Sequence, residues 1–576
     1  MKNNIIKMKT VIPILLLAAS SCMYAQQGKT ECITANPLNL NYRFYTDGVS
    51  HRTAADPVIV LYKDRYYLFA SHSSGYWSSS DLKNWNYIES KNLKSVESWA
   101  PAVLVYKDAI YFLGMGERRI FKSSNPDQDQ WEEIESKSKD YGDPAFFQDN
   151  DGRVYLYYGC SDNAPIKGFE VDPEDGFKAI SPEVDLIPPS AARLGWEVPG
   201  EKNEMTDKRG WNEAPCMVRD GDFYYLQYSA PGTEFTTYCT GVYVSKNPLG
   251  PYTCMEGGPF SIKPGGFIPG AGHGHPFKDR YGNDWYVASM IVSVKEHFER
   301  RIGIFPAFYK DGYSHGITDY TDFPFILPNK KVDFSKKSLS AKMNVLSYGK
   351  TMKASSFCPS HEPEKASDEN IKTSWSAASG KKGEWLQMDL NQPMKIAALQ
   401  ISFADEGFQT YRRDKNVPIY QYIVEYSTDG MEWETLVDRS QNTKDQIYEL
   451  VALDKAVKAR FVRVKNTKDF KVGRFSIADI RLFGEAKGKK PEIVSNFQVK
   501  RLDDRRRMSF SWNMQQPTTG YVIRWGTTPE RINNAAMVYG NQAEFGFFDC
   551  DMSYYVTIEA FNESGKAKRS APILID

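Results

Sequence analysis

The sequence has little of what marks several common classes of protein. It contains only 8 cysteines in 576 residues, which argues against a complete disulfide framework; Cys239 and Cys254 are spaced for a local pair, but unpaired thiols are favoured. Lys+Arg and Asp+Glu are equal at 72 each, so the basic excess typical of nucleic-acid binding is absent. Beyond the N-terminus no apolar run reaches the ~20 residues of a membrane span. Aromatic residues are abundant instead, at 14%, which suits β-sheets and ligands with flat apolar faces.

The first residues are typical of an export signal. Three lysines precede the apolar run VIPILLLAAS, and small residues follow it. We predict that residues 1–25 are a signal peptide cleaved after Ala25, with lipid attachment to Cys22 as the alternative. The protein is therefore expected to be exported to the periplasm, the medium or the cell surface. It would be either soluble or anchored at its N-terminus by the lipid on Cys22.

One pattern recurs five times in the first half of the chain. Each copy has a residue followed by Pro, an apolar run, a turn and an aromatic strand; the pairs are Asp56-Pro57, Ala100-Pro101, Asp143-Pro144, Ala214-Pro215 and His275-Pro276. Strand repeats of this size without a helical pattern predict a five-bladed β-propeller over residues 40–335. In a propeller, residues before equivalent strands converge on the central channel. The residues brought together there would be Asp56, Trp99, Asp143, Glu213, His273 and His275.

Carboxylates from three blades indicate a catalytic pocket at this point. An Asp before Pro is commonly a turn residue, so Asp56 and Asp143 are weak signals singly. Glu213 has no such explanation, and the three together favour acid–base chemistry.

The motifs ADP, WAP, DP-x-FF-x-D-x-DGR-x-YLYYG, EAP, GPY and G-x-GH occur in this order over residues 40 to 335. This series resembles glycoside hydrolase family 43, whose members are exported five-bladed propellers that hydrolyse arabinofuranosides, xylosides or galactans with inversion. The resemblance implies that Asp56 is the general base, Asp143 the residue that tunes a pKa and orients, and Glu213 the general acid. Inversion needs the base and the acid about 6.5–9.5 Å apart. We expect Asp143 to keep Glu213 protonated by raising its pKa, and Asp56 to stay ionised.

The resemblance also suggests ligands around the carboxylates. Arg300 matches a sugar-binding arginine, with Arg301 as the alternative, and His275 occupies the pre-proline position. Trp77 and Trp99 are candidate sugar platforms, with packing inside the blades as the alternative. His273 matches a histidine that contacts a calcium ion or its water shell, with a hydrogen-bonded core histidine as the alternative. A structural Ca²⁺ is the only cofactor expected, and no organic cofactor is implied.

The remaining chain changes character twice. Residues 340–487, with WLQMDL, YIVEYSTDGMEWETL and FSIADIRLFG, resemble a discoidin (coagulation factor type C) β-sandwich, a module often used to bind carbohydrate. The resemblance places a structural calcium at Asp368 and Thr373 and candidate sugar contacts at loop aromatics. These aromatics are Trp375, Phe408 and Tyr411, the first more typical of a core. Residues 495–576 resemble a fibronectin type III sandwich, a spacer with Trp512 in its core and Tyr554 or Tyr555 as its corner tyrosine.

Together these features predict an all-β, monomeric, exported enzyme. Its expected reaction is the inverting hydrolysis of O-glycosidic bonds in plant cell-wall polysaccharides that contain arabinose or xylose. Two alternatives stay open: a galactan-active glycosidase and a non-catalytic lectin or adhesion protein. A propeller fructosidase is disfavoured, because AADP lacks the Asn of an Asn-Asp-Pro motif. No nucleic-acid partner is expected.

Overall fold

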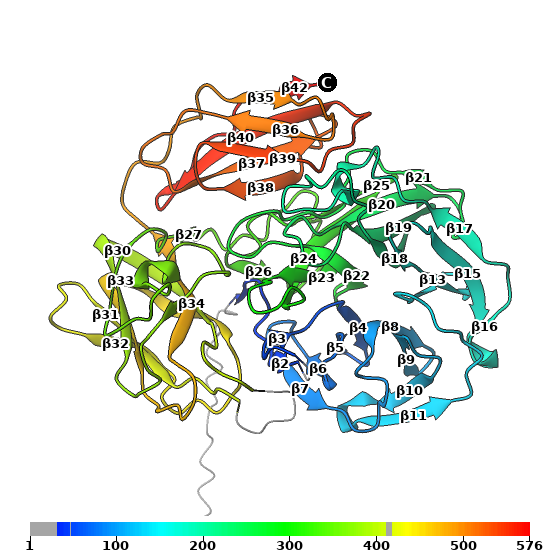
Figure 1. The fold of residues 1–576 in the computed structure, drawn as a ribbon, viewed down its shortest axis with the longest axis horizontal. Coiled ribbons are helices and arrows are strands. Elements are labelled where there is room, and N and C mark those ends of the chain that lie inside the picture. The colour runs from blue at the N-terminus through cyan, green and yellow to red at the C-terminus, as the bar shows by residue number, and fades with distance from the viewer. Residues whose placement is uncertain (1–30, 46–47, 411–416) are drawn as a thin grey trace, which may run out of the picture.

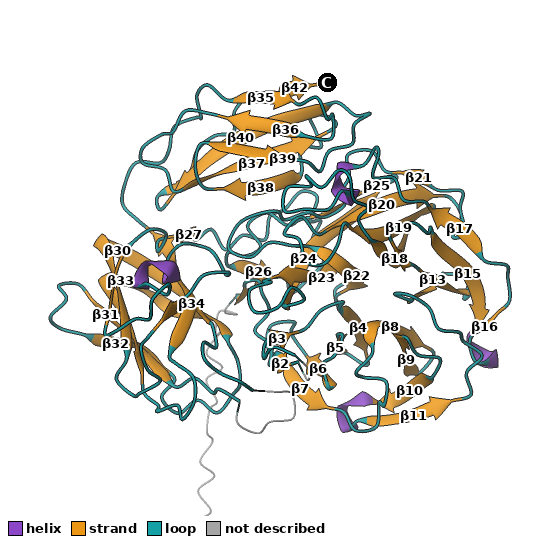
Figure 2. Ribbon diagram, viewed as in Figure 1, coloured by secondary structure: helices purple, strands orange, loops and turns teal. Residues whose placement is uncertain are grey.

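The structure is a computed structural model that describes residues 31–45, 48–410 and 417–576. It contains a ring of five sheets and two β-sandwiches, the ring in blue to green and the sandwiches in yellow and orange-red (Figure 1). Helix is confined in these residues to four short 3-10 turns, η1 (Pro126–Gln128), η2 (Pro173–Asp175), η3 (Gly195–Glu197) and η4 (Pro363–Ala366) (Figure 2). The predicted all-β class is confirmed. The proposed signal peptide (1–25), with Cys22 and Ala25, and the aromatic Tyr411 lie outside the described residues.

Each blade of the ring is an antiparallel sheet whose first strand is the innermost. Blade 1 contains β4 (Val58–Tyr62), β5 (Arg65–Phe69), β6 (Gly75–Ser79) and β7 (Asn86–Glu89). Blade 2 contains β8 (Trp99–Tyr106), β9 (Ala109–Met115), β10 (Ile120–Asn125) and β11 (Gln130–Ile134). Blade 3 contains β12 (Ala145–Gln148), β13 (Val154–Tyr158), β15 (Ile166–Asp172), β16 (Lys178–Ala179) and β17 (Val184–Ile187).

The last two blades complete the ring. Blade 4 contains β18 (Asn212–Asp220), β19 (Phe223–Ala230), β20 (Cys239–Ser245) and β21 (Thr253–Cys254), and β14 (Cys160–Ser161) adds to the free edge of β18. Blade 5 contains β22 (Gly272–Lys278), β23 (Asp284–Ile291), β24 (Arg300–Lys310) and β25 (Tyr313–Gly316). The innermost strands contact one another in a closed cycle, β4 to β8, β12, β18, β22 and back to β4. The predicted five-bladed propeller is therefore present.

Two short pairings lie beside the blades. β1 (Cys32–Thr34) pairs antiparallel with β26 (Phe325–Leu327), so the two ends of the propeller are joined by main-chain hydrogen bonds. β2 (Arg43–Phe44) pairs with β3 (Arg52–Thr53), just before the first innermost strand. Residues before position 40 therefore also pair with the end of the propeller, whose predicted bounds of 40–335 stay a prediction.

An unusual backbone conformation marks the entry to every innermost strand. The residues with positive φ are Asp56 (53°), Ala100 (41°), Asp143 (45°), Ala214 (56°) and His273 (39°). A non-glycine residue in this region costs about 1–3 kcal/mol and such residues cluster at functional sites. The register of β8, β18 and β22 shifts at the same point, which is a bulge that re-aims side chains. The five entries therefore turn their side chains toward one axis.

The second domain is a β-sandwich built on two long strands. β30 (Trp385–Phe403) and β33 (Tyr448–Asn466) pair along both halves, with a break in register between Asp389 and Met394 that divides each strand between two sheets. One sheet adds β28 (Thr351–Ala354), β31 (Tyr422–Ser427) and β32 (Glu434–Asp438); the other adds β27 (Asn344–Val345), β29 (Trp375–Ser376) and β34 (Ser476–Glu485). Trp375 is fully buried, so it belongs to the core.

The third domain is a smaller sandwich. Its sheets are β35 (Gln498–Arg501), β36 (Met508–Ser511) and β39 (Gln542–Phe545), against β37 (Gly520–Gly526), β38 (Asn534–Val538), β40 (Tyr554–Asn562), β41 (Gly565–Lys566) and β42 (Ile573–Ile575). Trp512 packs in its core as expected, and the hydroxyl of Tyr554 accepts a hydrogen bond from the amide of Asp549 at 3.0 Å. Its assignment to the fibronectin type III class stays a prediction.

Charged contacts hold the sandwiches against the propeller. Arg193 of the propeller lies 2.6 Å from Asp549 of the third domain, and Arg481 of the second domain donates to the main chain of Asp322 in the segment after blade 5. All seven cysteines that the structure describes are unpaired, including Cys239 and Cys254. In the described part of the chain, no helix has the length and apolarity needed to cross a bilayer.

Candidate active site

A pocket of about 360 Å³ opens at the end of the ring where the five strand entries meet. Its wall contains one or more residues from every blade: Asp56, Trp99, Met115, Asp143, Cys160, Trp211, Glu213, Gly232, Thr233, Glu234, His273, His297, Phe298 and Arg300. All three predicted catalytic carboxylates are among them. Each blade contributes to the floor of the pocket through one of two adjacent positions at its strand entry. Asp56, Asp143 and His273 are the residues with positive φ, and Trp99 and Glu213 stand directly before such a residue. The repeat thus delivers carboxylates that are distant in sequence to one cavity.

Asp56 is the most strongly held carboxylate of the pocket. Its Oδ1 lies 3.0 Å from the Arg300 guanidinium and 3.2 Å from His273 Nδ1, and its Oδ2 accepts from the Ser71 hydroxyl at 2.5 Å. Burial acts to raise the pKa of Asp56, but Arg300, His273 and Ser71 outweigh it and hold the pKa below its usual value. Asp56 is therefore ionised near neutral pH.

Asp143 has the opposite electrostatic setting. It is 5% exposed, and burial raises its pKa to about 7, with Glu213 and Asp56 adding to the rise and His273 opposing it. Its Oδ2 accepts from the amide of Ala214 at 3.1 Å. Asp143 thus has a raised pKa of its own; its expected effect on the pKa of Glu213 stays a prediction.

Glu213 lies beside Asp143 at the bulge of β18. Carboxylate oxygens of Asp143 and Glu213 and the Cys160 sulfur all lie within 4.8 Å of one another. Glu213 accepts from the Tyr238 hydroxyl at 2.5 Å and from the Cys160 thiol at 3.3 Å. These two donors hold one oxygen each of the Glu213 carboxylate, and the nearby charge of Glu213 adds to the raised pKa of Asp143.

His273 lies close to two of the three carboxylates. Its Nδ1 is 3.2 Å from Asp56 and 3.8 Å from Asp143. The floor of the pocket thus holds one carboxylate with a lowered pKa, Asp56, and one with a raised pKa, Asp143, on the same imidazole nitrogen.

Sequence reasoning missed several of these residues. Tyr238 lies in TTYC and Cys160 directly follows the aromatic strand of the third repeat; Cys160 pairs across β14 and β18 with Glu213. No repeat or motif marks Tyr238. Cys160, in contrast, directly follows YLYYG, and this position in the third repeat could have indicated a residue near the pocket. Ser71 likewise ends YYLFAS, at the end of the first repeat.

Aromatic side chains line the wall above the carboxylates. Trp99 and Phe298 pack edge to face, 6.0 Å apart between ring centres, and the Arg300 guanidinium carbon lies 5.9 and 5.4 Å from those centres. Trp211, two residues before Glu213, lines the same pocket and is 46% exposed. Arg300 also donates to the Thr233 hydroxyl at 2.9 Å, while Arg301 turns away to Glu299 and Tyr448. Of the two arginines left open by the sequence, Arg300 is the one in the pocket.

Two of the predicted sugar contacts are not on this wall. Trp77 is fully buried in β6 and packs against Tyr87 inside blade 1, so no sugar can stack on it; the packing alternative describes its position. His275 lines a smaller cavity beneath the pocket, on the propeller axis, and its Nδ1 lies 2.8 Å from the carbonyl of Pro276. In blade 5 the bulge makes His273, not His275, equivalent to Asp56, which moves His275 below the floor.

The axial cavity is the place where a calcium ion at His273 would lie. Its lining consists mainly of the proline and alanine residues that follow the five strand entries, together with Asp56, Asp143, His273 and His275. Nδ1 of His273 faces the two aspartates, which leaves Nε2 as the ring atom for a cation. Calcium prefers six to eight oxygen ligands, so an ion here would take most of its shell from water. The metal role of His273 stays a prediction.

The second predicted calcium position lies in the sandwich. Thr373 Oγ1 donates to Asp368 Oδ2 at 2.7 Å, and the amide of Asn370 donates to the other oxygen at 3.1 Å. Burial raises the pKa of Asp368 to about 6. The two residues are thus brought together as expected, with hydrogen bonds already on both carboxylate oxygens; the calcium itself stays a prediction.

Comparison with known proteins identifies two of the three domains. Residues 45–313 match the family Glycosyl hydrolases family 43, and residues 351–480 match the F5/8 type C domain. The Beta-D-galactofuranosidase xynD of Aspergillus niger is 24% identical over 271 residues, which is 40% of this chain and 72% of that protein.

Two solved structures align over much of the chain. A glycoside hydrolase aligns over 77% of this chain and 99% of its own, with 19% identity and a TM-score of 0.44. The Bacteroides ovatus xyloglucan PUL GH43B aligns over 94% of this chain and 98% of its own, with 13% identity and a TM-score of 0.40.

Proposed function

Because residues 45–313 form a domain of glycosyl hydrolases family 43, we propose that this protein is an exported, inverting glycosidase of plant cell-wall polysaccharides containing arabinose or xylose. Asp56 is the general base, Glu213 the general acid, and Asp143 the residue that tunes the pKa of the acid and orients it. Arg300, Trp99 and Trp211 bind the sugar.

The observation that carries the proposal is the opposite electrostatic setting of two carboxylates in one pocket. Asp56 has a lowered pKa and Asp143 a pKa raised to about 7, although both are almost completely buried. Acid–base catalysis needs this division, one group ionised and another protonated at the same pH. Inversion requires the base and the acid to stand about 6.5–9.5 Å apart with a water molecule between them, and we assign these roles to Asp56 and Glu213, which both line the same pocket.

The proposed reaction is a single displacement at the anomeric carbon. Asp56 accepts a proton from a water molecule, whose oxygen forms the new bond to the anomeric carbon. The bond from that carbon to the glycosidic oxygen breaks on the opposite face, and the leaving oxygen takes a proton from Glu213. Asp143 lies within 4.8 Å of Glu213, and its role in this proposal is to favour the protonated form of the acid through its own negative charge. The two proton transfers return the enzyme's total charge to its starting value.

The wall of the pocket supports a neutral sugar as substrate. Trp99, Phe298 and Trp211 offer flat apolar faces to the C–H side of a sugar ring, while Thr233 and Arg300 offer hydrogen-bonding groups. The cation of Arg300 is already paired with Asp56 at 3.0 Å, so it is not free to select an acidic sugar. The second domain, as an F5/8 type C module, would add affinity for the polysaccharide.

The decisive experiment measures hydrolysis and its stereochemistry together. We expect the full chain to hydrolyse aryl α-L-arabinofuranoside or aryl β-D-xyloside, and Glu213→Gln and Asp56→Asn to lose at least about 10²-fold in kcat. Proton NMR of the first product should show the anomer opposite to that of the substrate. Retention would refute the inverting assignment. Absence of hydrolysis on every pentoside and galactan, with polysaccharide binding intact, would favour the lectin alternative.

A second substrate class deserves a place in the same panel. The relative from Aspergillus niger is named a galactofuranosidase. β-D-Galactofuranose has the ring configuration of α-L-arabinofuranose and differs by one exocyclic carbon, so a pocket for one can accept the other. If aryl β-D-galactofuranoside has the highest kcat/KM of the panel, the furanoside specificity stands and the plant-polysaccharide assignment falls.

A further inference from the structure

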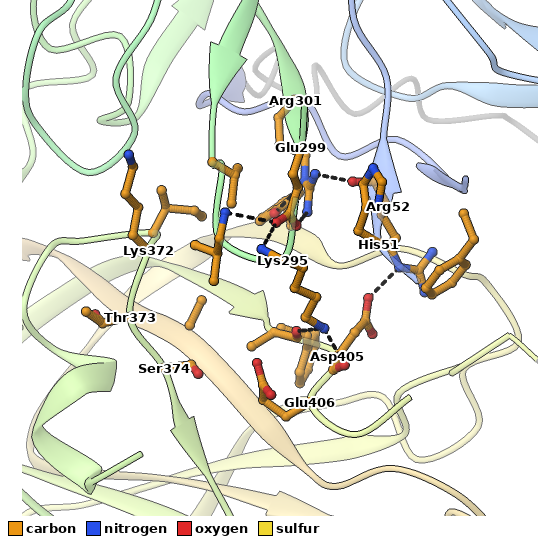
Figure 3. A pocket seen from close by; sticks show the side chains of 18 residues that line it. His51, Arg52, Lys295, Glu299, Arg301, Lys372, Thr373, Ser374, Asp405 and Glu406 are labelled. Carbon is orange, nitrogen blue, oxygen red and sulfur yellow. Dashed lines mark hydrogen bonds and ion pairs between the residues drawn. The ribbon is translucent and has the colours of Figure 1, made fainter. Parts of the chain in front are cut away.

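A polar pocket lies at the boundary between the propeller and the second domain (Figure 3). Arg52, Lys295, Glu299 and Arg301 enter it from the propeller, and Asp405 and Tyr448 from the sandwich. The charges are paired across the boundary: Arg52 Nε lies 2.5 Å from Asp405 and its terminal nitrogen 2.8 Å from Asp445. Arg52 is 2% exposed. A buried ion pair of this kind strongly penalises loss of one partner, so the two domains are expected to keep one relative position.

The chain between β23 and β24 connects this boundary to the active site. We call residues 293–299 the blade 5 loop. Its Lys295 ammonium donates to the main-chain carbonyls of Ala404 and Asp405 in the sandwich, at 3.1 and 2.6 Å. The amide of Lys295 donates to the carboxylate of Glu299 at 3.0 Å, which folds the loop onto itself. His297 and Phe298, two and three positions after Lys295, line the catalytic pocket.

The C-terminal end of the blade 5 loop is connected to the proposed base, Asp56, by hydrogen bonds and an ion pair. The carbonyl of Phe298 accepts from the Thr53 hydroxyl at 3.1 Å, and the Arg300 amide donates to the same hydroxyl at 3.3 Å. Arg300 then reaches Asp56 at 3.0 Å. Arg301, next along the chain, donates to the Tyr448 hydroxyl of the sandwich at 2.7 Å. Lys295, before Phe298, and Arg301, after Arg300, therefore both form hydrogen bonds to the second domain.

We propose that the second domain is a positioning part of the active site, and that Lys295 is the positioning residue through which it sets Phe298 and Arg300. This inference rests on the proposed function of the pocket, because it concerns the placement of groups that bind the sugar and contact the base. The sandwich is then required for catalysis on small soluble substrates, where polysaccharide binding has no role. A detachable carbohydrate-binding module would have no such effect.

Lys295→Met tests the inference without leaving an unpaired charge in the boundary. The matched control is Lys372→Met, since Lys372 lines the same boundary pocket from the sandwich side and its nearest acidic partner, Glu201, is 3.9 Å away. Within the described residues, Lys372 forms no hydrogen bond or ion pair with the blade 5 loop, so the control removes an equal charge at the same boundary. Lys295→Arg keeps a donor for the two carbonyls and should restore most of the loss.

On an aryl pentoside we expect Lys295→Met to lower kcat/KM about 10- to 100-fold, mainly by raising KM, because misplaced binding groups remote from the changed residue produce losses of this size. Lys372→Met should stay within about twofold of the parent. A merely structural role for Lys295 would lower the melting temperature or the active fraction and leave KM unchanged. Equal KM values in the two variants would overturn the inference.

Amide hydrogen exchange of residues 293–301 provides a readout that does not depend on activity. Faster exchange in this segment in Lys295→Met, with no change in Lys372→Met, supports the positioning role. Unchanged exchange in both variants overturns it. If the parent protein hydrolyses nothing, the proposed function has failed, and the exchange result still decides whether the sandwich orders the blade 5 loop.

Discussion

Removal of the Arg300 guanidinium should change the pH at which the enzyme loses its base. Arg300 and Asp56 are 4% and 3% exposed and lie 3.0 Å apart, so their interaction is little screened by solvent. An opposite charge at this distance lowers a carboxyl pKa by about 1–3 units, or about 1.4–4 kcal/mol. In Arg300→Met the pKa of Asp56 should rise by that amount, because burial, which opposes ionisation, is no longer outweighed.

The assay is the pH dependence of kcat/KM on an aryl pentoside. A base works only when ionised, so a higher pKa moves the acidic limb of the profile to higher pH, by about 1–3 units. Arg300→Lys keeps the charge and should shift the limb less. A general fall in rate is expected in both variants, since Arg300 also faces the sugar; the position of the limb is the diagnostic quantity. A limb that stays in place in Arg300→Met would show that Arg300 does not control Asp56.

Three further outcomes are expected. Asp143 has a pKa of about 7, so kcat/KM of the parent should fall above about pH 7, and Asp143→Asn, which removes this titrating carboxyl, should move that alkaline limb; a limb unchanged in the variant would contradict the assignment. Trp211→Ala should raise KM by about 3- to 10-fold with little change in kcat, in line with about 0.5–1.5 kcal/mol for an aromatic contact; an unchanged KM would exclude Trp211 from sugar binding. Arg52, Lys295 and Tyr420 outweigh burial and hold the pKa of Asp405 below its usual value. The contribution of ionised Asp405 to the free energy of unfolding is therefore present above about pH 4, and it is lost as the pH falls through the lower pKa of the folded state. Melting temperatures between pH 6 and pH 3 should therefore drop less in Asp405→Asn than in the parent.

Much of the fold could be predicted because the propeller repeats one local pattern. A residue before Pro, an apolar run and an aromatic strand describe a blade well enough to count five of them, and the count is confirmed by the closed cycle of innermost strands. The pairing of β1 with β26 was not predicted, since three-residue strands without a strong pattern leave no signal in the sequence.

The site was predicted through the same repeat, with errors where the repeat is distorted. Asp56 and Asp143 occupy the positive-φ position, and Glu213 the position before it, so all three reach the pocket. In blade 5 the residue with positive φ is His273, three residues before Pro276, whereas in blades 1 and 3 the proline follows that residue directly. Counting back from Pro276 therefore pointed to His275 instead of His273. Trp77 shows a different limit: every residue of β6 is buried, and a sequence does not distinguish a tryptophan inside a blade from one at a pocket.

Contacts between domains were beyond the reach of the sequence. Arg52, Asp405 and Asp445 belong to two domains and are separated by several hundred residues, and single charged residues in loops are usually solvated. Arg52 stands only four positions before the base, and its role is the ion pair with the sandwich.

The joining of β1 to β26 also sets an order of events in folding. The partner of Cys32–Thr34 is Phe325–Leu327, so the ring cannot close until nearly the whole propeller has been synthesised. Contacts so distant along the chain form slowly, because the closure entropy of the intervening segment must be overcome first. Until then β1 and β26 each lack their partner strand, and a binding factor that covers the first strand during this interval would protect the protein from aggregation.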